Sequence, residues 1–273
     1  MGLDGGEPEL SLLIQPGYEK RGAEVATRLG ISTTLAADNT HSKHYLTYDD
    51  TGLSLLSQIA LNGRSPASVR CEFVSGQLRH RRFFGGGIGQ TLSRANGISA
   101  NFKPLIADLT AGLGADGFVL ASLGAQVVLV ERHPAVAELL RDGLLRLRLH
   151  LEQHEDASLQ AIHSRLALQH LDGKNWLQGL TEKERPDVIY LDPMFPERRK
   201  TAKVKKAMAV FQGLLGDDDD ADELLGAALD RARYRVVVKR PRRAPPLQGR
   251  SPAFSIEGKT TRFDIYTLKK LPR

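Results

Sequence analysis

The second half of this chain alternates short apolar segments with segments of helical periodicity. Apolar runs typical of buried strands occupy residues 105–107, 126–130, 166–170, 188–191 and 234–239. Segments with apolar residues at three- and four-residue spacing, typical of helices, lie between them at 117–123, 135–154 and 222–232. Strands that alternate with helices pair in parallel and are covered on both faces, so we predict an α/β fold built on a parallel sheet. We expect a late run at 263–267 to add an antiparallel strand.

The first hundred residues have a less regular pattern. They predict three strands and two helices, at 11–14, 45–48, 69–74, 18–29 and 90–95. A glycine cluster at 85–89 indicates a tightly turning junction. We therefore predict a small mixed α/β N-terminal domain at 1–100 and a larger sheet domain at 101–273.

Composition narrows the class of protein. Lysine and arginine exceed aspartate and glutamate by 38 to 32, a net charge of +6 that permits a polyanionic partner without requiring one. Cys71 is the only cysteine, so no disulfide forms within the chain and no cysteine-based zinc site exists. His150 and His154 have zinc-like spacing but no evident third ligand, so we predict no metal. Without a signal peptide or a membrane-length apolar stretch, the expected location is the cytoplasm.

A glycine-rich loop follows the first strand of the larger domain. It matches the pattern G-x-G-x-x-G at Gly112-Leu113-Gly114-Ala115-Asp116-Gly117. Asp108 ends the strand before it, and Glu131 ends the next strand, where an acid can accept hydrogen bonds from ribose hydroxyls. A dinucleotide and S-adenosylmethionine both suit such a loop. The carboxylates of Asp108 and Asp116 would repel a pyrophosphate and attract the cationic methionine end, which favours S-adenosylmethionine.

A second loop, Asp192-Pro193-Met194-Phe195, follows the apolar strand at 188–191. A base amine is poorly nucleophilic, so an enzyme must orient it and accept its hydrogens as charge develops. The Asp192 carboxylate and the Pro193 carbonyl are suitable acceptors, and Phe195 offers a face on which a base can stack. Facing a cofactor loop, this loop predicts methylation of a nucleic-acid base at nitrogen.

Basic residues follow this second loop directly. Six cations, which we predict to contact RNA phosphates beside the target pocket, are Arg198, Arg199, Lys200, Lys203, Lys205 and Lys206.

Together these residues resemble the ribosomal RNA small subunit methyltransferase J family. The resemblance is carried by 108–114, Glu131-Arg132, 191–196, Lys205-Lys206, 210–212, 236–241 and 262–266. It covers most of the chain from about residue 80 onward and extends more loosely to the N-terminal part. It implies a Rossmann-like class I methyltransferase sheet behind a small N-terminal domain.

The resemblance also implies an activity and a set of cofactor contacts. The implied reaction transfers methyl from S-adenosylmethionine to the exocyclic N2 of one guanine in small-subunit ribosomal RNA, either as naked RNA or within the small ribosomal subunit. The cofactor positions of the family fall on Ala115, Asp116, Glu131, Arg132, Asp172, Gly173 and Asp192. The chain departs from the family at Ala115, where arginine is typical, and at Asp172-Gly173, where a serine pair is usual.

Two other functions stay open from the residues alone. One is an NAD-dependent oxidoreductase that uses the same glycine loop. The other is a non-catalytic RNA-binding protein that uses the basic segment. The residues by themselves also do not distinguish N2 of guanine from N6 of adenine.

Overall fold

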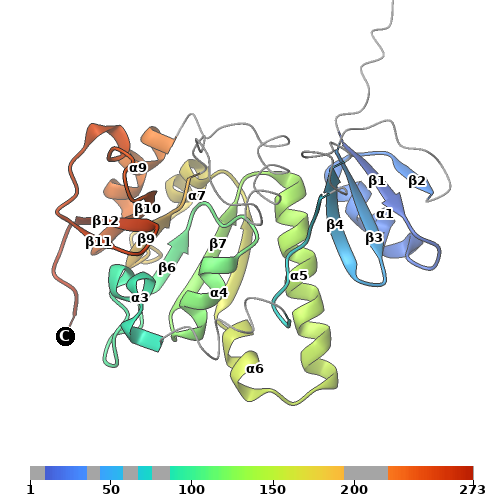
Figure 1. The fold of residues 1–273 in the computed structure, drawn as a ribbon, viewed down its shortest axis with the longest axis horizontal. Helices are drawn as coiled ribbons and strands as arrows, with labels where there is room; N and C mark the ends of the chain where they lie inside the picture. Colours follow the sequence, from blue (N-terminus) through green and yellow to red (C-terminus); the bar gives the residue numbers. More distant parts are fainter. Residues whose placement is uncertain (1–9, 36–43, 58–66, 76–86, 194–220, 273) are drawn as a thin grey trace, which may run out of the picture.

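The larger of two sheets contains seven strands and forms the centre of the molecule (Figure 1). The computed structural model describes residues 10–35, 44–57, 67–75, 87–193 and 221–272. Within them the seven strands are β6 (Leu105–Asp108), β7 (Gln126–Glu131), β8 (Leu166–His170), β9 (Val188–Leu191), β10 (Arg235–Pro241), β11 (Phe254–Glu257) and β12 (Thr261–Thr267). Their order across the sheet is β11-β12-β10-β9-β6-β7-β8. The predicted parallel sheet with a late antiparallel strand is confirmed, because β6 to β10 pair in parallel and β12 pairs antiparallel with β10.

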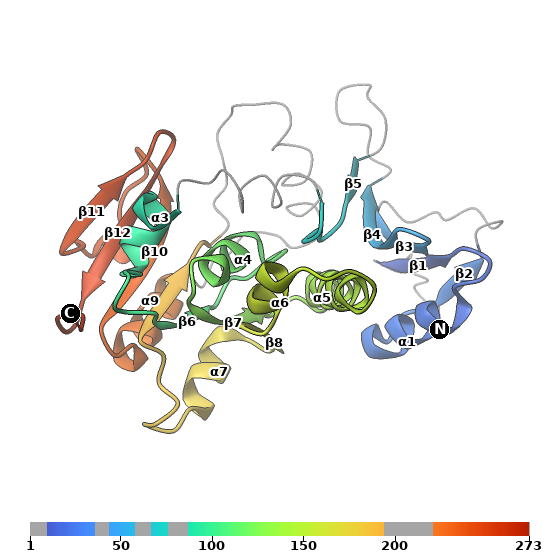
Figure 2. The ribbon, with the colours of Figure 1, turned by 90° about the horizontal axis from the view of Figure 1, so that it is seen from below.

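Helices cover both faces of this sheet, as Figure 2 shows from below. Helices α3 (Thr91–Asn96), α4 (Ala115–Ser122), α5 (Pro134–Gln153) and α6 (Ala157–His163) lie on one side. Helices α7 (Gly173–Gly179) and α9 (Ala221–Arg231) lie on the other. Short 3₁₀ turns, η2 and η3, occupy Gly87–Gly89 and Leu247–Gly249.

Alternation along the strands explains why both faces are apolar. Successive side chains of a strand point to opposite faces, and in β9 Val188 and Tyr190 join the core under α4 while Ile189 and Leu191 join the core under α7 and α9. All four are fully buried. A strand buried on both faces needs an uninterrupted apolar run, which is the pattern that predicted it.

In the described residues before α3, the N-terminal sheet has five strands in the order β2-β1-β3-β4-β5. They are β1 (Ser11–Ile14), β2 (Thr33–Leu35), β3 (His44–Asp49), β4 (Gly52–Ser57) and β5 (Ala67–Val69), with helix α1 (Glu19–Leu29) between β1 and β2. The strand predicted at 69–74 was wrong for residues 70–74, which lie outside any strand. Cys71 and Phe73 instead insert into the core of the larger sheet. Strands β2, β4 and β11 and helices α6 and α7 were not predicted.

Helix α5 joins the two sheets. Its residues Ala135, Val136 and Leu139 pack in the core of the N-terminal sheet. Asp142 accepts hydrogen bonds from the Tyr48 hydroxyl and from the Leu53 amide, each at 3.0 Å. The proposed domain boundary near residue 100 stays a prediction.

Candidate active site

The carboxyl ends of β6 and β9 meet where the order of the sheet reverses. After β6 the chain adds β7 and β8 on one side, and it then returns to place β9 and β10 on the other. Ligands of open α/β sheets bind in the crevice beyond such a reversal. The glycine loop follows β6 and the Asp192 loop follows β9, so both predicted loops lie at this crevice.

Thr110 connects the two loops directly. Its hydroxyl oxygen accepts a hydrogen bond of 2.6 Å from the Asp192 backbone amide. Its own amide donates to the Asp108 carboxylate at 3.2 Å. The Leu109 amide donates to the Tyr190 carbonyl at 3.1 Å. Residues about 80 positions apart in the chain are therefore held within one hydrogen-bond network, and the expected meeting of the two loops is confirmed.

Glu131 fastens the glycine loop to the end of β7. One carboxylate oxygen accepts from the Gly112 amide and the other from the His133 amide, each at 2.8 Å. Two backbone amides therefore hold the Glu131 carboxylate where the glycine loop meets the end of β7. Arg132, the next residue, is exposed.

Two glycines of the loop have backbone angles that favour glycine. Gly112 and Gly114 have φ of +53° and +72°, a region that other residues rarely adopt. A Cβ at Gly112 would meet no atom of the described residues within 4 Å, so among them its backbone faces open space that a ligand can approach. Gly114 precedes α4, whose first residue Ala115 is exposed.

Lys239 forms a cluster with two of the predicted carboxylates. Its ammonium nitrogen donates to Oδ2 of Asp116 and to Oδ2 of Asp192, both at 2.7 Å. The Tyr190 hydroxyl donates to the same Asp116 oxygen at 2.8 Å. Lys239 was not among the predicted site residues. The sequence shows only that Lys239 ends the apolar run at 234–239, whereas the pairing of this strand with β9 is seen only in the structure.

Burial and the neighbouring charges together shift the pKa values of the groups in this cluster. Burial, followed by repulsion from Asp116, raises the pKa of Asp108 to about 8. Burial, followed by the surrounding carboxylates, raises the pKa of Tyr190 well above its usual value, so its hydroxyl stays a donor. Burial lowers the pKa of Lys239, but attraction to Asp192 and Asp116 outweighs burial and raises it overall, so the ammonium stays charged.

The charges of the cluster suit a cationic ligand. Three carboxylates, Asp108, Asp116 and Asp192, stand against one ammonium, so their sum stays negative even with Asp108 protonated. A pyrophosphate would be repelled, whereas the sulfonium and amino groups of S-adenosylmethionine would be attracted. The residues therefore fit that cofactor, although Lys239 offsets part of the charge expected at Asp116.

Asp172 and Gly173 lie at the start of α7, after the end of β8. One oxygen of Asp172 accepts from the amides of Lys174 and Asn175 at 3.0 Å each, which makes Asp172 the N-terminal cap of the helix. The preceding residue, Leu171, donates its amide to the Glu131 carbonyl at 3.1 Å. The pair therefore adjoins Glu131, and its predicted contact with adenine stays a prediction.

Pro193 is buried and is the last described residue of the Asp192 loop. Phe195 and the six cations lie outside the described residues, and these cations are Arg198, Arg199, Lys200, Lys203, Lys205 and Lys206.

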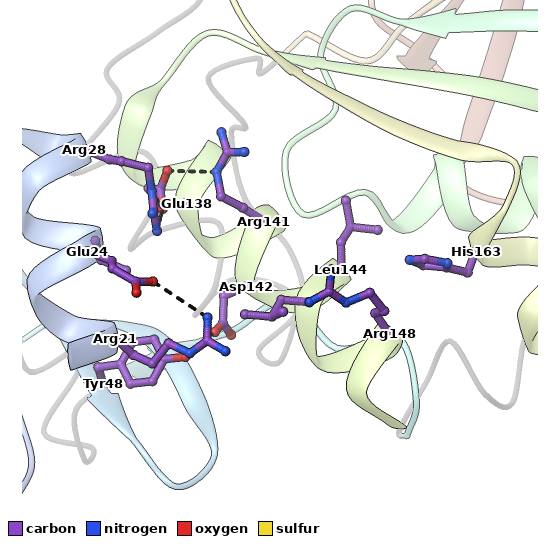
Figure 3. A pocket seen from close by; sticks show the side chains of 12 residues that line it. Arg21, Glu24, Arg28, Tyr48, Glu138, Arg141, Asp142, Leu144, Arg148 and His163 are labelled. Atoms are coloured by element: carbon purple, nitrogen blue, oxygen red, sulfur yellow. Dashed lines mark hydrogen bonds and ion pairs between the residues drawn. The ribbon is translucent and has the colours of Figure 1, made fainter. Parts of the chain in front are cut away.

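A separate cavity of about 400 Å³ lies between α1 and α5 (Figure 3). Several of its charged side chains pair with each other, since Arg28 and Arg141 both bind Glu138, at 2.9 and 3.0 Å. His163, at the other end of its lining, precedes the start of β8 rather than following the end of a strand. The cavity is thus a charged seam between the N-terminal sheet and α5, away from the strand ends that form the crevice.

Comparisons with known proteins agree with this arrangement. Residues 27–268 match the family model described as "Putative SAM-dependent methyltransferase". The ribosomal RNA small subunit methyltransferase J of Cellvibrio japonicus is 51% identical over 228 residues, 83% of this chain and 84% of that protein. The protein of the same name from Pseudomonas aeruginosa strain LESB58 is 46% identical over 98% of both chains. The crystal structure of a SAM-dependent methyltransferase from Neisseria gonorrhoeae has a TM-score of 0.70 and 34% identity, and the match covers 94% of this chain and 95% of that one. None of the described helices is long and apolar enough to cross a membrane.

Proposed function

Because the chain belongs to the ribosomal RNA small subunit methyltransferase J family, we propose that it methylates the exocyclic N2 of a guanine in small-subunit (16S) ribosomal RNA. It is an S-adenosylmethionine-dependent methyltransferase. Family membership decides against the NAD-dependent oxidoreductase and the non-catalytic RNA-binding protein. The observation that carries the proposal is the hydrogen bond of 2.6 Å between Asp192 and Thr110. It joins the Asp192 loop after β9, which we call the target loop, to the glycine-rich loop after β6, which we call the cofactor loop.

The cofactor would lie along the glycine loop and the end of β7. Glu131 would hold the ribose hydroxyls, since both its oxygens are already fixed by backbone amides. Asp108 and Asp116 would face the cationic methionine end, and Asp172 with Gly173 would contact the adenine. When bound, S-adenosylmethionine supplies a sulfonium methyl group, whose carbon–sulfur bond breaks as the bond to the base nitrogen forms.

The target amine would be oriented by Asp192 and Pro193. Asp192 is held at the crevice by two contacts, from the Lys239 ammonium to its Oδ2 and from its backbone amide to the Thr110 hydroxyl. It would accept an N–H of the amine as positive charge develops on nitrogen, and the Pro193 carbonyl would accept the second. Phe195 would stack on the base, and the cations that follow it would hold the flanking phosphates.

The setting of the reaction follows from its substrate. Ribosomal RNA is made and assembled in the cytoplasm of bacteria, so we place the protein there, with ribosomal RNA or the small subunit as partner. We also propose that residues 1–100 and 101–273 act as two units.

The variant Asp192→Ala tests the proposal. Ribosomal RNA from a strain lacking the gene serves as substrate, with radiolabelled S-adenosylmethionine and mass spectrometry of the nucleosides as readouts. We expect the variant to lose transfer by about 100-fold or more, the scale of removing one transition-state acceptor, with an unchanged circular dichroism spectrum. Asp230→Ala, an exposed carboxylate on α9, is the matched control. Normal methylation by Asp192→Ala would refute the assigned chemistry, and wild-type product other than N2-methylguanine would refute the assigned target.

A further inference from the structure

Lys239 connects the target loop to the cofactor helix. It lies on β10, whose preceding residue Val238 pairs with Leu191 of β9, so Lys239 stands level with Asp192 just beyond the end of β9. Its ammonium bridges Asp192 and Asp116, the latter in the first turn of α4. Its side chain is only 25% exposed. The three groups come from three different elements of the fold.

We propose that Lys239 is a positioning residue that holds the Asp192 carboxylate ionised and correctly oriented for the target amine. This inference rests on the proposed function, because it concerns the acceptor of that amine. Lys239 also connects the two halves of the site, because the same ammonium binds Asp116 in the first turn of α4, the helix that follows the cofactor loop.

Repulsion explains why such a residue is needed. The carboxylate of Asp192 faces Asp108 from β6, Asp116 from α4 and the Tyr190 hydroxyl from β9. Asp108 is largely protonated at neutral pH, so the like charge that disfavours ionisation of Asp192 there is that of Asp116, which shares the Lys239 ammonium. Without the ammonium, Asp192 would rotate away from its neighbours or take up a proton at a higher pH. A protonated carboxyl is a weaker acceptor for the amine hydrogens.

Lys239 does not serve as the base. The carboxylates that it contacts raise its pKa in spite of burial, so at neutral pH the ammonium has no lone pair to accept the amine proton. Its contribution to transfer is therefore through Asp192.

The experiment compares Lys239→Met, which keeps the length of the side chain without its charge, with Lys239→Arg, which keeps the charge. The full chain is assayed for kcat from pH 5.5 to 9 on deproteinised small-subunit ribosomal RNA, and S-adenosylmethionine binding is measured by calorimetry. For Lys239→Met we expect kcat to fall by about 10- to 100-fold, as for a misplaced reacting group. We expect the acidic limb of its profile of kcat against pH to move to higher pH by about one unit. Lys239→Arg should return that limb to the wild-type position.

Controls separate this role from a structural one. Lys103→Met removes an exposed lysine that precedes β6 and bonds the Leu123 carbonyl, so it should leave both kcat and the acidic limb unchanged. Lys239→Gln is a second neutral variant, to be used if Lys239→Met loses its cooperative unfolding transition. An acidic limb that stays at the wild-type position in the neutral variants would overturn the inference, as would a shift that Lys239→Arg fails to reverse.

The outcomes also distinguish this inference from the proposed function. Wild-type protein that binds S-adenosylmethionine but methylates neither the deproteinised RNA nor the small ribosomal subunit would overturn the proposed function, and this inference with it. Wild-type protein that methylates the RNA, beside a neutral variant with the wild-type pH profile, would overturn the role of Lys239 alone.

Discussion

Asp108 should make the stability of this protein fall as pH rises through the neutral range. Its carboxyl is 2% exposed, and burial raises its pKa from 3.8 to about 8. Between these two values the folded state holds a proton that the unfolded state releases. Stability contributed by this proton is complete below about pH 4 and is lost progressively up to about pH 8. The variant Asp108→Asn has no proton to lose, and its amide oxygen can still accept from Thr110.

The size of the effect follows from the pKa difference. Each unit corresponds to about 1.4 kcal/mol, so the full shift sets a ceiling of about 6 kcal/mol. Between pH 5 and pH 7 the wild type should lose about 2–3 kcal/mol of unfolding free energy relative to the variant. The advantage of Asp108→Asn should therefore grow with pH and level off above pH 8.

Urea unfolding at pH 5, 6, 7 and 8, followed by far-ultraviolet circular dichroism, measures this difference. Asp230→Asn, an exposed carboxylate on α9, is the control and should track the wild type at every pH. A difference between Asp108→Asn and wild type that is constant across the series would show that Asp108 does not titrate there, and would refute the reasoning.

Two further predictions concern packing. Asp142→Ala leaves the buried donors that bond this carboxylate unpaired, so the free energy of unfolding, measured by heat or urea, should fall by about 3–5 kcal/mol. The control Glu152→Ala removes an exposed ion pair and should lower it by about 0–1 kcal/mol. Equal losses in the two variants would contradict a joining role for α5. Gly117→Ala puts a Cβ into overlap with Cδ2 of the buried Leu129, so it should destabilise by about 1–3 kcal/mol. Gly226→Ala, in α9 with no atom of the described part of the chain within 4 Å of the new Cβ, should instead stabilise by about 0.5–1 kcal/mol, and a loss there would contradict the helix-propensity argument.

The elements of the larger sheet were predictable because their signals are local. A strand buried on both faces, such as β9, needs a continuous apolar run, and α5 needs apolar residues at helical spacing over 20 residues. Short or partly exposed elements were missed because their local signal is too weak. Strand β11 alternates apolar and polar residues, but it spans only four residues, three of them exposed, so its pattern is too short to mark a buried face.

The chemistry at the strand ends could likewise be predicted from neighbouring residues. Asp108, Glu131 and Asp192 each end or follow an apolar run, and parallel strands present such ends at one edge. The residue Lys239 was missed because its partners, Asp116 and Asp192, are 123 and 47 positions away. No local pattern marks a lysine that neutralises distant carboxylates.

The sequence alone determined the alternation of strands and helices and the acidic, glycine-rich loops that select a cationic cofactor, because periodicity and strand-end chemistry depend on adjacent residues. Tertiary structure decided which strands are neighbours, and so brought Thr110 to Asp192 and Lys239 to both Asp192 and Asp116. It also decided that α5 is shared by two cores, with Asp142 bonded to Tyr48 and Leu53 across them. Those contacts join residues far apart in the chain, and they form only where packing of the whole fold brings buried charges and donors within reach of their partners.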